Sequence, residues 1–332
     1  MLRHKPLYFP DEKDEKMRVY RASYLWDGHQ LHRDAFLYVK DGLITSPAEG
    51  EVVDLGRKLI MPGFVNSHTH VAMVLMRGLG DGLPLQSWLR RMWEVEEKLD
   101  EKVLKKASLY GLAEMASSGI TAFMDFYNVP PMVRALKRIK LRAVLTLAFM
   151  DKVEYMKEES WKRVRTVDRY LRMTKEVGAT LAIGPHAPYT CTLEMLSEIG
   201  KLSKKYRLKI HTHLAETVNE VLRIKKEYGE RPLGLLKKAG LVNERLVVAH
   251  GIYLTAEEMR ELGKAGATVV HCPRSNSRLG SGIAKVGELV GHGVNVALGT
   301  DGPASSEDFD MFEEMRLALY LRRAKERKPV SM

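Results

Sequence analysis

The sequence predicts an α/β fold, a (β/α)8 barrel of the TIM type preceded by a small β-domain. From about residue 58 onward, short apolar runs alternate with longer amphipathic stretches, which is the pattern of parallel strands joined by helices. Eight apolar runs occur over about 250 residues, the usual size of such a barrel. Earlier in the chain, apolar and polar residues alternate between Asp-Gly turns. We therefore expect a small β-domain over residues 1–57 and a barrel over residues 58–332.

The small β-domain is expected to hold short strands. Apolar and polar side chains alternate over residues 17–26, 35–45 and 51–56, with Asp-Gly turns at Asp27-Gly28 and Asp41-Gly42. We expect these strands to form one small antiparallel sheet.

The barrel elements follow in order along the chain. Its strands are expected at Leu59–Asn66, Thr121–Phe126, Arg142–Phe149, Thr180–Gly184, Leu208–His213, Arg245–His250, Thr268–His271 and Val294–Gly299. Helices are expected at Glu101–Ser117, Trp161–Glu176, Leu193–Lys205, Thr217–Tyr228, Ala256–Lys264 and Ile283–Val290. A doubly wound open sheet is the alternative, but no Gly-x-Gly-x-x-Gly sequence follows the first strand, which favours the barrel.

The composition excludes several classes of protein. Hydrophobic residues make up 45% of the 332 residues and charged residues 29%, which excludes a disordered chain. No apolar run approaches the roughly 18 residues of a membrane helix, and the first 16 residues lack the apolar centre of a signal peptide. Cys191 and Cys272 are too few for a disulfide scaffold. We therefore expect a cytoplasmic protein with no membrane partner.

The net charge of +11 invites the hypothesis of a nucleic-acid partner. Lys and Arg are interspersed with Asp and Glu, as in residues 158–165, and do not form one basic tract. That pattern is typical of a solvated surface with many salt bridges. We therefore expect no nucleic-acid partner.

Seven of the eleven histidines fall at or just beyond the ends of the expected strands. In a barrel of this type the active site lies at the carboxyl ends of the strands. The polar residues found there are His68, His70, Asp125, Asp151, His186, His211, His213, His250, His271 and Asp301. This concentration predicts a catalytic site built largely from histidines.

Two His-x-His sequences predict metal ligands. His68 and His70 end the first strand, and residues two apart on a strand point to the same side, so both rings can bind one metal. The alternative is a hydrogen-bonded pair of histidines at a turn. His211 and His213 repeat the arrangement: we expect His213 to be the third ligand and His211 to pack deeper in the barrel or to support the site.

Three further residues fit acid–base chemistry beside such a metal. Glu216 follows His213 by three residues and could exchange a proton with water or substrate; the alternative is a charge favoured by a helix N-terminus. His250 ends the sixth strand, and Asp301 ends the eighth and could take the proton of a bound water. Three histidines and one aspartate leave a position open for water, as catalytic zinc sites do. His271 is expected to support the site or anchor a loop.

Nine short segments together resemble the amidohydrolase superfamily, and within it the deaminase and chlorohydrolase branch. The resemblance is strongest to the 5′-methylthioadenosine/S-adenosylhomocysteine deaminases, and it runs from about residue 17 to the end. The matching segments are residues 61–70, 75–78, 88–89, 184–188, 211–216, 249–251, 271–276, 281–282 and 298–302.

The resemblance implies one divalent metal, Zn2+ or else Fe2+, held by His68, His70, His213 and Asp301. It implies that Glu216 delivers a proton to the ring nitrogen beside the attacked carbon. His250 and Asp301 would orient and deprotonate the water.

The resemblance also implies contacts with substrate. His186 stands where two-metal relatives carry a lysine, which favours a single metal and places His186 against the substrate. Glu96 would accept hydrogen bonds from the ribose hydroxyls, with Glu97 as the alternative if the register slips by one residue. Ser305 would line the pocket.

Two features depart from the family pattern. Leu147 stands where some relatives carry an arginine that binds the carboxylate of S-adenosylhomocysteine, and we expect Arg163 and Arg165 to lie on an exposed helix. This favours an apolar-tailed nucleoside. The chain also ends at Met332, where relatives continue and add strands to the small β-domain. We therefore expect an incomplete β-domain, because the chain is a fragment or because a homo-oligomer supplies the missing strands.

These features predict a metal-dependent hydrolytic deaminase with a small-molecule substrate. The expected substrate is an adenine nucleoside such as 5′-methylthioadenosine or S-adenosylhomocysteine, and the expected product is ammonia. Two alternatives stay open. One is an aminohydrolase or chlorohydrolase acting on guanine, cytosine or s-triazine rings, and the other is an inactive, truncated barrel.

Overall fold

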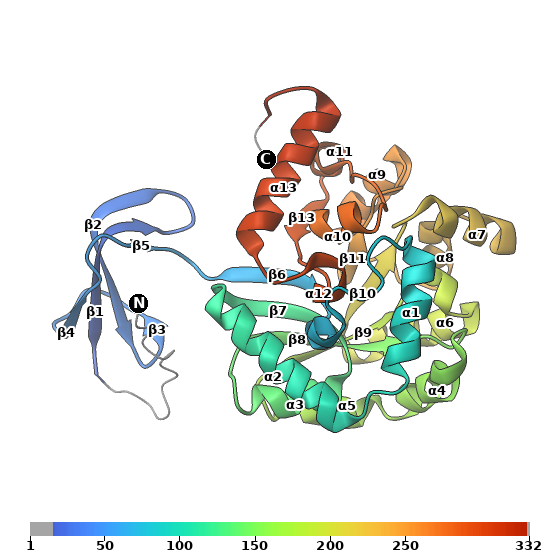
Figure 1. The fold of residues 1–332 in the computed structure, drawn as a ribbon, viewed down its shortest axis with the longest axis horizontal. Helices are drawn as coiled ribbons and strands as arrows, with labels where there is room; N and C mark the ends of the chain where they lie inside the picture. The colour runs from blue at the N-terminus through green and yellow to red at the C-terminus, as the bar shows by residue number, and fades with distance from the viewer. Residues whose placement is uncertain (1–15, 331–332) are drawn as a thin grey trace. The chain divides into compact units, whose positions relative to one another are not determined.

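The computed structural model describes residues 16–330 (Figure 1). The chain divides into two compact units between Phe64 and Val65, which is later than the expected boundary after residue 57. Each unit has its own sheet, one with five strands and one with eight.

The smaller unit holds a mixed sheet. Its strands are β1 (Arg18–Trp26), β2 (Leu31–Lys40), β3 (Leu43–Ile44), β4 (Glu51–Asp54) and β5 (Leu59–Ile60). β1 pairs with β2 in antiparallel fashion, but β4 and β5 both pair parallel to β1. The expectation of an antiparallel sheet was therefore wrong for β4, and β5 was not expected in this sheet. β3 and β4 are joined by a longer connection than a hairpin turn, which lets β4 cross to the opposite edge of the sheet and pair with β1.

The larger unit is a barrel of eight strands that neighbour one another in chain order. They are β6 (Phe64–Thr69), β7 (Ile120–Tyr127), β8 (Arg142–Phe149), β9 (Thr180–Pro185), β10 (Lys209–Leu214), β11 (Leu246–His250), β12 (Thr268–His271) and β13 (Asn295–Leu298). The pairs from β7 to β13 are parallel. The fold class expected from the sequence is confirmed.

The first barrel strand differs from the expected Leu59–Asn66. Leu59 and Ile60 pair with β1 of the small sheet, and β6 begins at Phe64. Pro62-Gly63 separates the two segments, because proline cannot donate to a ladder and glycine favours a break. As a result β6 extends through His68 to Thr69.

The ends of the barrel meet through close backbone contacts. The Asp301 N–H donates to the carbonyl of His68 at 3.0 Å, just beyond β13. A Cβ on Gly299 would lie 2.7 Å from that same carbonyl oxygen, so only glycine fits there. These contacts bring the loop after β13 against β6, and they place Asp301 beside His68.

Helices lie between successive strands of the barrel (Figure 1). The α-helices are α1 (Leu85–Glu96), α2 (Glu101–Ser117), α3 (Val129–Leu136), α4 (Lys157–Arg165), α5 (Val167–Lys175), α6 (Leu193–Tyr206), α7 (Val218–Tyr228), α8 (Pro232–Lys238), α9 (Ala256–Ala265), α10 (Pro273–Arg278), α11 (Val286–Gly291), α12 (Pro303–Ser306) and α13 (Met311–Glu326). Short 3-10 turns are η1 (Val71–Met76), η2 (Glu154–Met156) and η3 (Pro188–Thr190). The helix expected over Trp161–Glu176 is broken into α4 and α5 at Thr166. Among the described residues, no helix combines the length and apolar character needed to cross a bilayer.

The interior of the barrel is a packed apolar layer. Met124, Ala182, Val247, Val270 and Cys272 are buried against one another, and they come from β7, β9, β11 and β12, Cys272 directly following β12. Met124 lies two residues before Phe126, whose ring contacts the rings of His68 and His70. This apolar layer therefore fills the barrel interior below the histidines at the strand ends.

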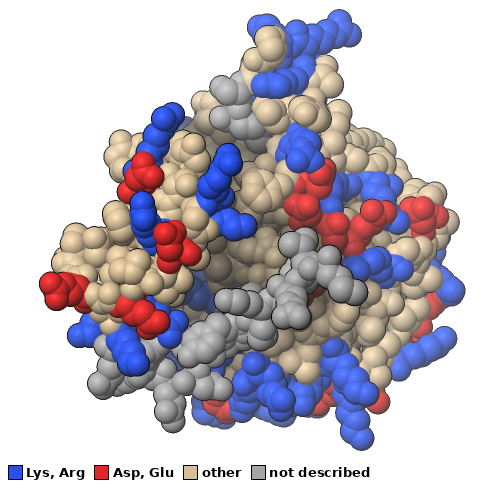
Figure 2. All heavy atoms as spheres, turned by 60° about the vertical axis from the view of Figure 1, so that its left-hand side comes forward, with Lys and Arg blue, Asp and Glu red and all other residues tan. Residues whose placement is uncertain are grey.

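Charged side chains of both signs are interspersed over the face drawn in Figure 2. Ion pairs such as Lys137 with Glu176 at 2.9 Å and Lys237 with Glu261 at 2.7 Å are largely solvent-exposed. This arrangement agrees with the salt-bridged surface expected from the sequence pattern.

Candidate active site

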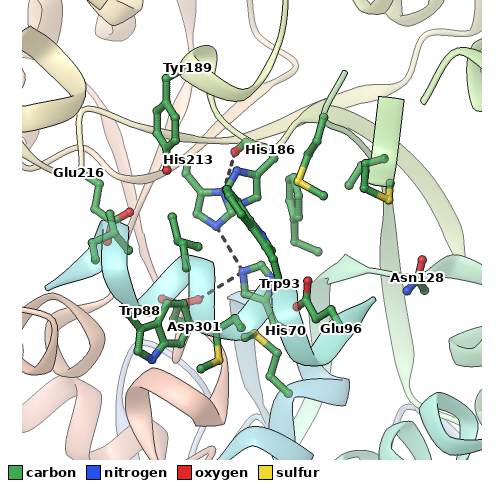
Figure 3. Close-up of a pocket in the computed structure, with 18 of the residues that line it drawn as sticks. His70, Trp88, Trp93, Glu96, Asn128, His186, Tyr189, His213, Glu216 and Asp301 are labelled. Carbon is green, nitrogen blue, oxygen red and sulfur yellow. Dashed lines mark hydrogen bonds and ion pairs between the residues drawn. The ribbon is translucent and has the colours of Figure 1, made fainter. Parts of the chain in front are cut away.

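Four expected metal ligands lie together at the carboxyl end of the barrel. His68 ends β6, His70 follows it, His213 lies on β10, and Asp301 follows β13. Their ligand atoms all lie within 4.8 Å of one another, and all four residues are buried. Figure 3 shows His70, His213 and Asp301 pointing toward one another.

His68 is held from behind by a chain of polar contacts. Its Nδ1 lies 2.8 Å from Nε2 of His211, and Nδ1 of His211 lies 2.8 Å from the hydroxyl of Thr146. The other nitrogen, Nε2 of His68, is buried without a hydrogen-bond partner among the described residues. It lies 3.3 Å from Oδ1 of Asp301. His211 thus orients His68 from below, as metal-binding histidines require.

The contacts of His213 and His70 favour a shared cation. Nδ1 of His213 donates to the carbonyl of His186 at 2.6 Å, which leaves a lone pair on its Nε2. That atom lies 3.2 Å from Nε2 of His70. Burial lowers the pKa of His70 to about 3, so its ring is neutral. Two neutral rings and a carboxylate that converge on one point are the nitrogen and oxygen donors that a divalent cation prefers. The cluster is therefore suited to a metal.

Asp301 is fixed in a rare backbone conformation. Its φ of +60° lies in the left-handed region, which is uncommon for residues with a side chain and is often found at functional sites. Oδ2 accepts hydrogen bonds from Ser275 at 2.5 Å and from Ser305 at 3.2 Å, and Oδ1 accepts one from the N–H of Gly302 at 2.8 Å. Burial opposes ionisation, but the close imidazoles of His68, His70 and His250 outweigh it, and the pKa of Asp301 stays well below its usual range.

Ser305 differs from its expected place. It is fully buried, and its hydroxyl contacts Asp301, Ser275 and the carbonyl of Gly302. A cavity opens beside the four-residue cluster, and Ser305 is not among the described residues that line it. The reason is that Ser305 lies in the short helix α12, directly behind Asp301, so its side chain hydrogen-bonds to the carboxylate and does not face the cavity.

Glu216 and His250 face each other across the same cavity. Oε2 of Glu216 lies 3.7 Å from Nε2 of His250, and Oε1 accepts a hydrogen bond from Ser281 at 3.1 Å. Nδ1 of His250 lies 2.8 Å from Oδ1 of Asn276, and the backbone of His250 has a φ of +71°. Burial raises the pKa of Glu216. Burial also opposes a charge on His250, but the carboxylates of Glu216 and Asp301 outweigh it and raise the pKa of that histidine. The pair is therefore suited to exchanging a proton.

The cavity beside the cluster has an aromatic wall. Trp88, Trp93 and Glu96 reach it from α1, and His186 reaches it from the end of β9 (Figure 3). Glu97, the alternative to Glu96, is exposed at the end of α1 and does not line the cavity. The rings of His186 and Trp93 are 6.2 Å apart, so His186 stands between the cluster and the aromatic wall.

Arg163 corrects an expectation. It was expected on an exposed helix, but only 7% of it is exposed and it lines the cavity. Its guanidinium donates to the carbonyl of Ala148 at 2.8 Å and to Oδ1 of Asn128 at 3.1 Å. These acceptors come from β8 and from the loop after β7, so the tertiary structure draws the side chain inward. Arg165 is exposed, and Leu147 is buried in β8.

Three other polar residues at strand ends do not line the cavity. Asp125 accepts a hydrogen bond from the N–H of Val71 at 2.9 Å, and Asp151 accepts from the N–H of Thr192 at the start of α6 at 2.8 Å. His271 is buried at the end of β12, and its carbonyl accepts from the N–H of Gly299. These residues connect strands to neighbouring loops and helices.

Sequence reasoning gave no role to two residues that act on the site. Ser275 and Asn276 are consecutive in α10, and they hold Asp301 and His250 respectively. The signal available was their position in the segment 271–276, which carried the resemblance. Nothing in the sequence indicated which strand-end residue each would reach.

Fold and site together define the class of α/β-barrel enzymes that carry a metal-ligand cluster at the carboxyl ends of their strands. Residues 59–331 match the model of the amidohydrolase family, so the chain belongs to that family. It is a hydrolase that acts on carbon–nitrogen bonds.

Three proteins with names or structures that concern deamination are similar to this chain. The chain is 41% identical to the 5-methylthioadenosine/S-adenosylhomocysteine deaminase of Pyrococcus furiosus, over 86% of this chain and 69% of that protein. It is 38% identical to the 5′-deoxyadenosine deaminase of Methanosphaera stadtmanae, over 82% of this chain and 65% of that protein. A crystal structure of an adenosine deaminase from Xanthomonas campestris with bound zinc matches with a TM-score of 0.85 and 29% identity, over 94% of this chain and 75% of that one.

Proposed function

We propose that the protein catalyses the hydrolytic deamination of an adenine nucleoside, with 5′-methylthioadenosine or S-adenosylhomocysteine as the substrate class. Water would replace the amino group on the purine ring, giving the hypoxanthine nucleoside and ammonia. The observation that carries this proposal is the facing pair of Glu216 and His250, which stand 3.7 Å apart beside the four-residue cluster. Relatives named as deaminases of such nucleosides, at 35–41% identity, support it.

The metal would be held by His68, His70, His213 and Asp301. We propose zinc, with iron(II) as the alternative; the bound zinc of the Xanthomonas campestris structure supports the first. A bound divalent cation supplies Lewis acidity, which makes water nucleophilic near neutral pH. Nε2 of His68 is buried and has no hydrogen-bond partner in the described part of the chain, and such a cation would satisfy it.

Glu216 and His250 would carry the protons of the reaction. The carbonyl oxygen of Asn276 accepts from Nδ1 of His250, so its Nε2 keeps a lone pair that can accept a proton from the attacking water. Burial favours the protonated form of Glu216, which can donate its own proton to the ring nitrogen beside the amino-bearing carbon. Asp301 would help to orient the water. His250 would then pass the water proton to the amino group, which leaves as ammonia, and Glu216 would take up the proton of the new hydroxyl group as the ring recovers its aromatic electrons.

The cavity wall would recognise the nucleoside. Trp88 and Trp93 offer flat apolar surfaces for a purine, and His186 stands between them and the cluster. Glu96 would accept hydrogen bonds from ribose hydroxyls. Arg163 lies in the same wall but already donates to Ala148 and Asn128, so an apolar 5′ tail is expected to bind better than a charged one.

The proposed location is the cytoplasm, because Cys191 and Cys272 are both unpaired and buried, as thiols of a reducing compartment commonly are. A homo-oligomer is also proposed. The apolar side chains Tyr24, Leu31 and Phe36 are exposed on the small sheet, and a second chain could cover them.

The test is a turnover assay on zinc-loaded protein. The substrates are 5′-methylthioadenosine, S-adenosylhomocysteine, 5′-deoxyadenosine and adenosine, followed by the ultraviolet change from adenine to hypoxanthine and by ammonia release. We expect turnover of at least one, with the apolar-tailed substrates preferred. The Glu216→Gln variant should bind zinc normally and turn over about 10³-fold more slowly.

Two outcomes would contradict the proposal. No ammonia from any of the four nucleosides, despite one bound metal per chain, would exclude an adenine-nucleoside deaminase. Turnover of guanine, cytosine or an s-triazine in parallel reactions, with none of the nucleosides, would assign the site to a different ring.

A further inference from the structure

The sequence pattern Thr-x-x-Glu begins two helices of the barrel, but the two glutamates do different things. In α9 the pattern forms a complete capping box. Oε2 of Glu258 accepts from the N–H of Thr255 at 2.8 Å, while the hydroxyl of Thr255 accepts from the N–H of Glu258 at 3.2 Å. Both bonds stay within the first turn of that helix.

In α7 only one half of this arrangement is present. The hydroxyl of Thr217 accepts from the N–H of Glu220 at 3.2 Å, as in α9. The carboxylate of Glu220, however, reaches past Thr217 to the turn that precedes the helix. Its Oε1 accepts from the N–H of Ala215 at 2.8 Å and its Oε2 from the N–H of Glu216 at 2.9 Å.

The turn that Glu220 holds is buried and has an unusual backbone. Ala215 has a φ of +51°, and Ala215, Glu216 and Glu220 are all buried. A left-handed residue turns successive N–H groups toward one side, where a carboxylate can bridge them. Because water has little access, the two N–H groups depend on Glu220 for their hydrogen bonds.

This turn also aims the proposed proton donor. It connects His213 at the end of β10 to Glu216, whose carboxylate faces Nε2 of His250 at 3.7 Å and accepts from Ser281. Ser281 contacts only one oxygen of the side chain. The carbonyls of Leu214 and Ala215 accept from the N–H groups of Gly251 and Tyr253, at 3.1 and 2.9 Å. The N–H groups of Ala215 and Glu216, in contrast, are both held by the carboxylate of Glu220.

We propose that Glu220 is a positioning residue for the deamination, holding the 215–216 turn so that Glu216 points at the substrate and His250. The inference rests on the proposed function. Glu220 lies behind the turn, is not among the residues that line the cavity, and acts through Glu216.

Glu258 provides a matched control for Glu220. It is the glutamate of the same pattern in α9, and it is also buried. It forms an additional ion pair with Arg231 at 3.0 Å, so its removal should harm folding at least as much. It lies outside the cavity wall.

The experiment compares Glu220→Ala, Glu258→Ala, Glu216→Gln and the double variant Glu220→Ala/Glu216→Gln on the best nucleoside substrate. We expect kcat of Glu220→Ala to fall about 10²-fold, because a small displacement of a reacting group has that effect, while KM changes less than about threefold. Glu258→Ala should keep the kcat of the parent protein.

The double variant should be no slower than Glu216→Gln, because both substitutions remove the same function. Glu220→Gln, which keeps one acceptor oxygen and serves if Glu220→Ala does not fold, should lie between parent and Glu220→Ala.

Hydrogen exchange of the 215 and 216 amides gives a readout that needs no turnover. Both amides should lose protection in Glu220→Ala and keep it in Glu258→Ala. Unchanged protection, a kcat no lower than that of Glu258→Ala, or multiplicative losses in the double variant would each overturn the inference. A parent protein without activity would sink the proposed function, and the exchange measurement would still decide whether Glu220 holds the turn.

Discussion

The two ends of the cavity are built in different ways. At the end with the metal-ligand cluster, each side chain stands at the end of a strand and is held by another buried group. The ring of His68 is hydrogen-bonded to His211, which is hydrogen-bonded to Thr146. His213 donates to the carbonyl of His186. The barrel itself closes through this cluster, since the Asp301 N–H donates to His68.

The opposite end takes both of its tryptophans and Glu96 from a single helix. Trp88, Trp93 and Glu96 all come from α1. That helix follows a loop in which Gly78, Gly80 and Gly82 have φ values of +77°, +74° and +76°. Its N-cap residue is Pro84, which makes no side-chain capping bond. The hydroxyl of Tyr155 donates to Glu96 over a long 3.3 Å.

The difference separates two tasks. The scaffold of strands fixes the groups that we propose to perform the chemistry, and an added helix supplies the surface that we propose to select the substrate. Substitutions at the first end should therefore lower kcat, and substitutions at the second should raise KM.

The largest expected effect comes from Asp301→Asn. The amide keeps the size of the side chain but removes the charge from the cluster, so the metal content should fall and kcat/KM should drop by about 10³-fold. Metal analysis and turnover of the zinc-loaded variant measure both. Asp308→Asn is the control, because Asp308 pairs with Arg274 outside the cavity. A variant at Asp301 with full metal and full activity would show that the cluster is not the reaction centre.

The same division explains which site residues could be predicted from the sequence. Residues at strand ends carry their own signal, since a barrel always brings those ends together, and His68, His70 and His213 were expected for that reason. Arg163 gave the opposite signal. Its helix is charged on most sides, and only the acceptors from Ala148 and Asn128, remote in sequence, draw the side chain inward.

The predicted boundaries of strands and helices were wrong where the local sequence pattern was ambiguous. Leu59–Asn66 was expected as one strand, although Pro62-Gly63 divides it between two sheets. α1 was not expected as a helix. The parallel orientation of β4 could not be predicted either, because the alternation of apolar and polar residues identifies a strand but not its partner or its orientation.

The second prediction tests the α1 end of the cavity with Glu96→Gln. The amide retains one acceptor oxygen but loses the charge that strengthens hydrogen bonds from ribose hydroxyls. We expect KM to rise about tenfold with kcat nearly unchanged, since bonds to charged groups contribute about 1.5–3 kcal/mol. Steady-state kinetics measures both constants. Glu97→Gln, one residue further along and exposed, should match the parent. An equal rise in KM for Glu96→Gln and Glu97→Gln would mean that the ribose is not recognised specifically by Glu96.

The smallest expected effect is that of Tyr155→Phe. Burial and the nearby carboxylate of Glu96 raise the pKa of Tyr155, so its hydroxyl stays protonated and donates to Glu96. Because the bond is long, its loss should raise KM only about two- to threefold, or about 0.5 kcal/mol.

Tyr206→Phe is the control for this small change. It removes a hydroxyl that donates to Asp168 at 3.0 Å on the exposed surface, and it should leave both constants unchanged. A tenfold or greater fall in kcat for Tyr155→Phe would break the division between the two ends. The α1 wall would then hold the reacting atoms in place as well as the ribose, and the strands alone would not account for the chemistry.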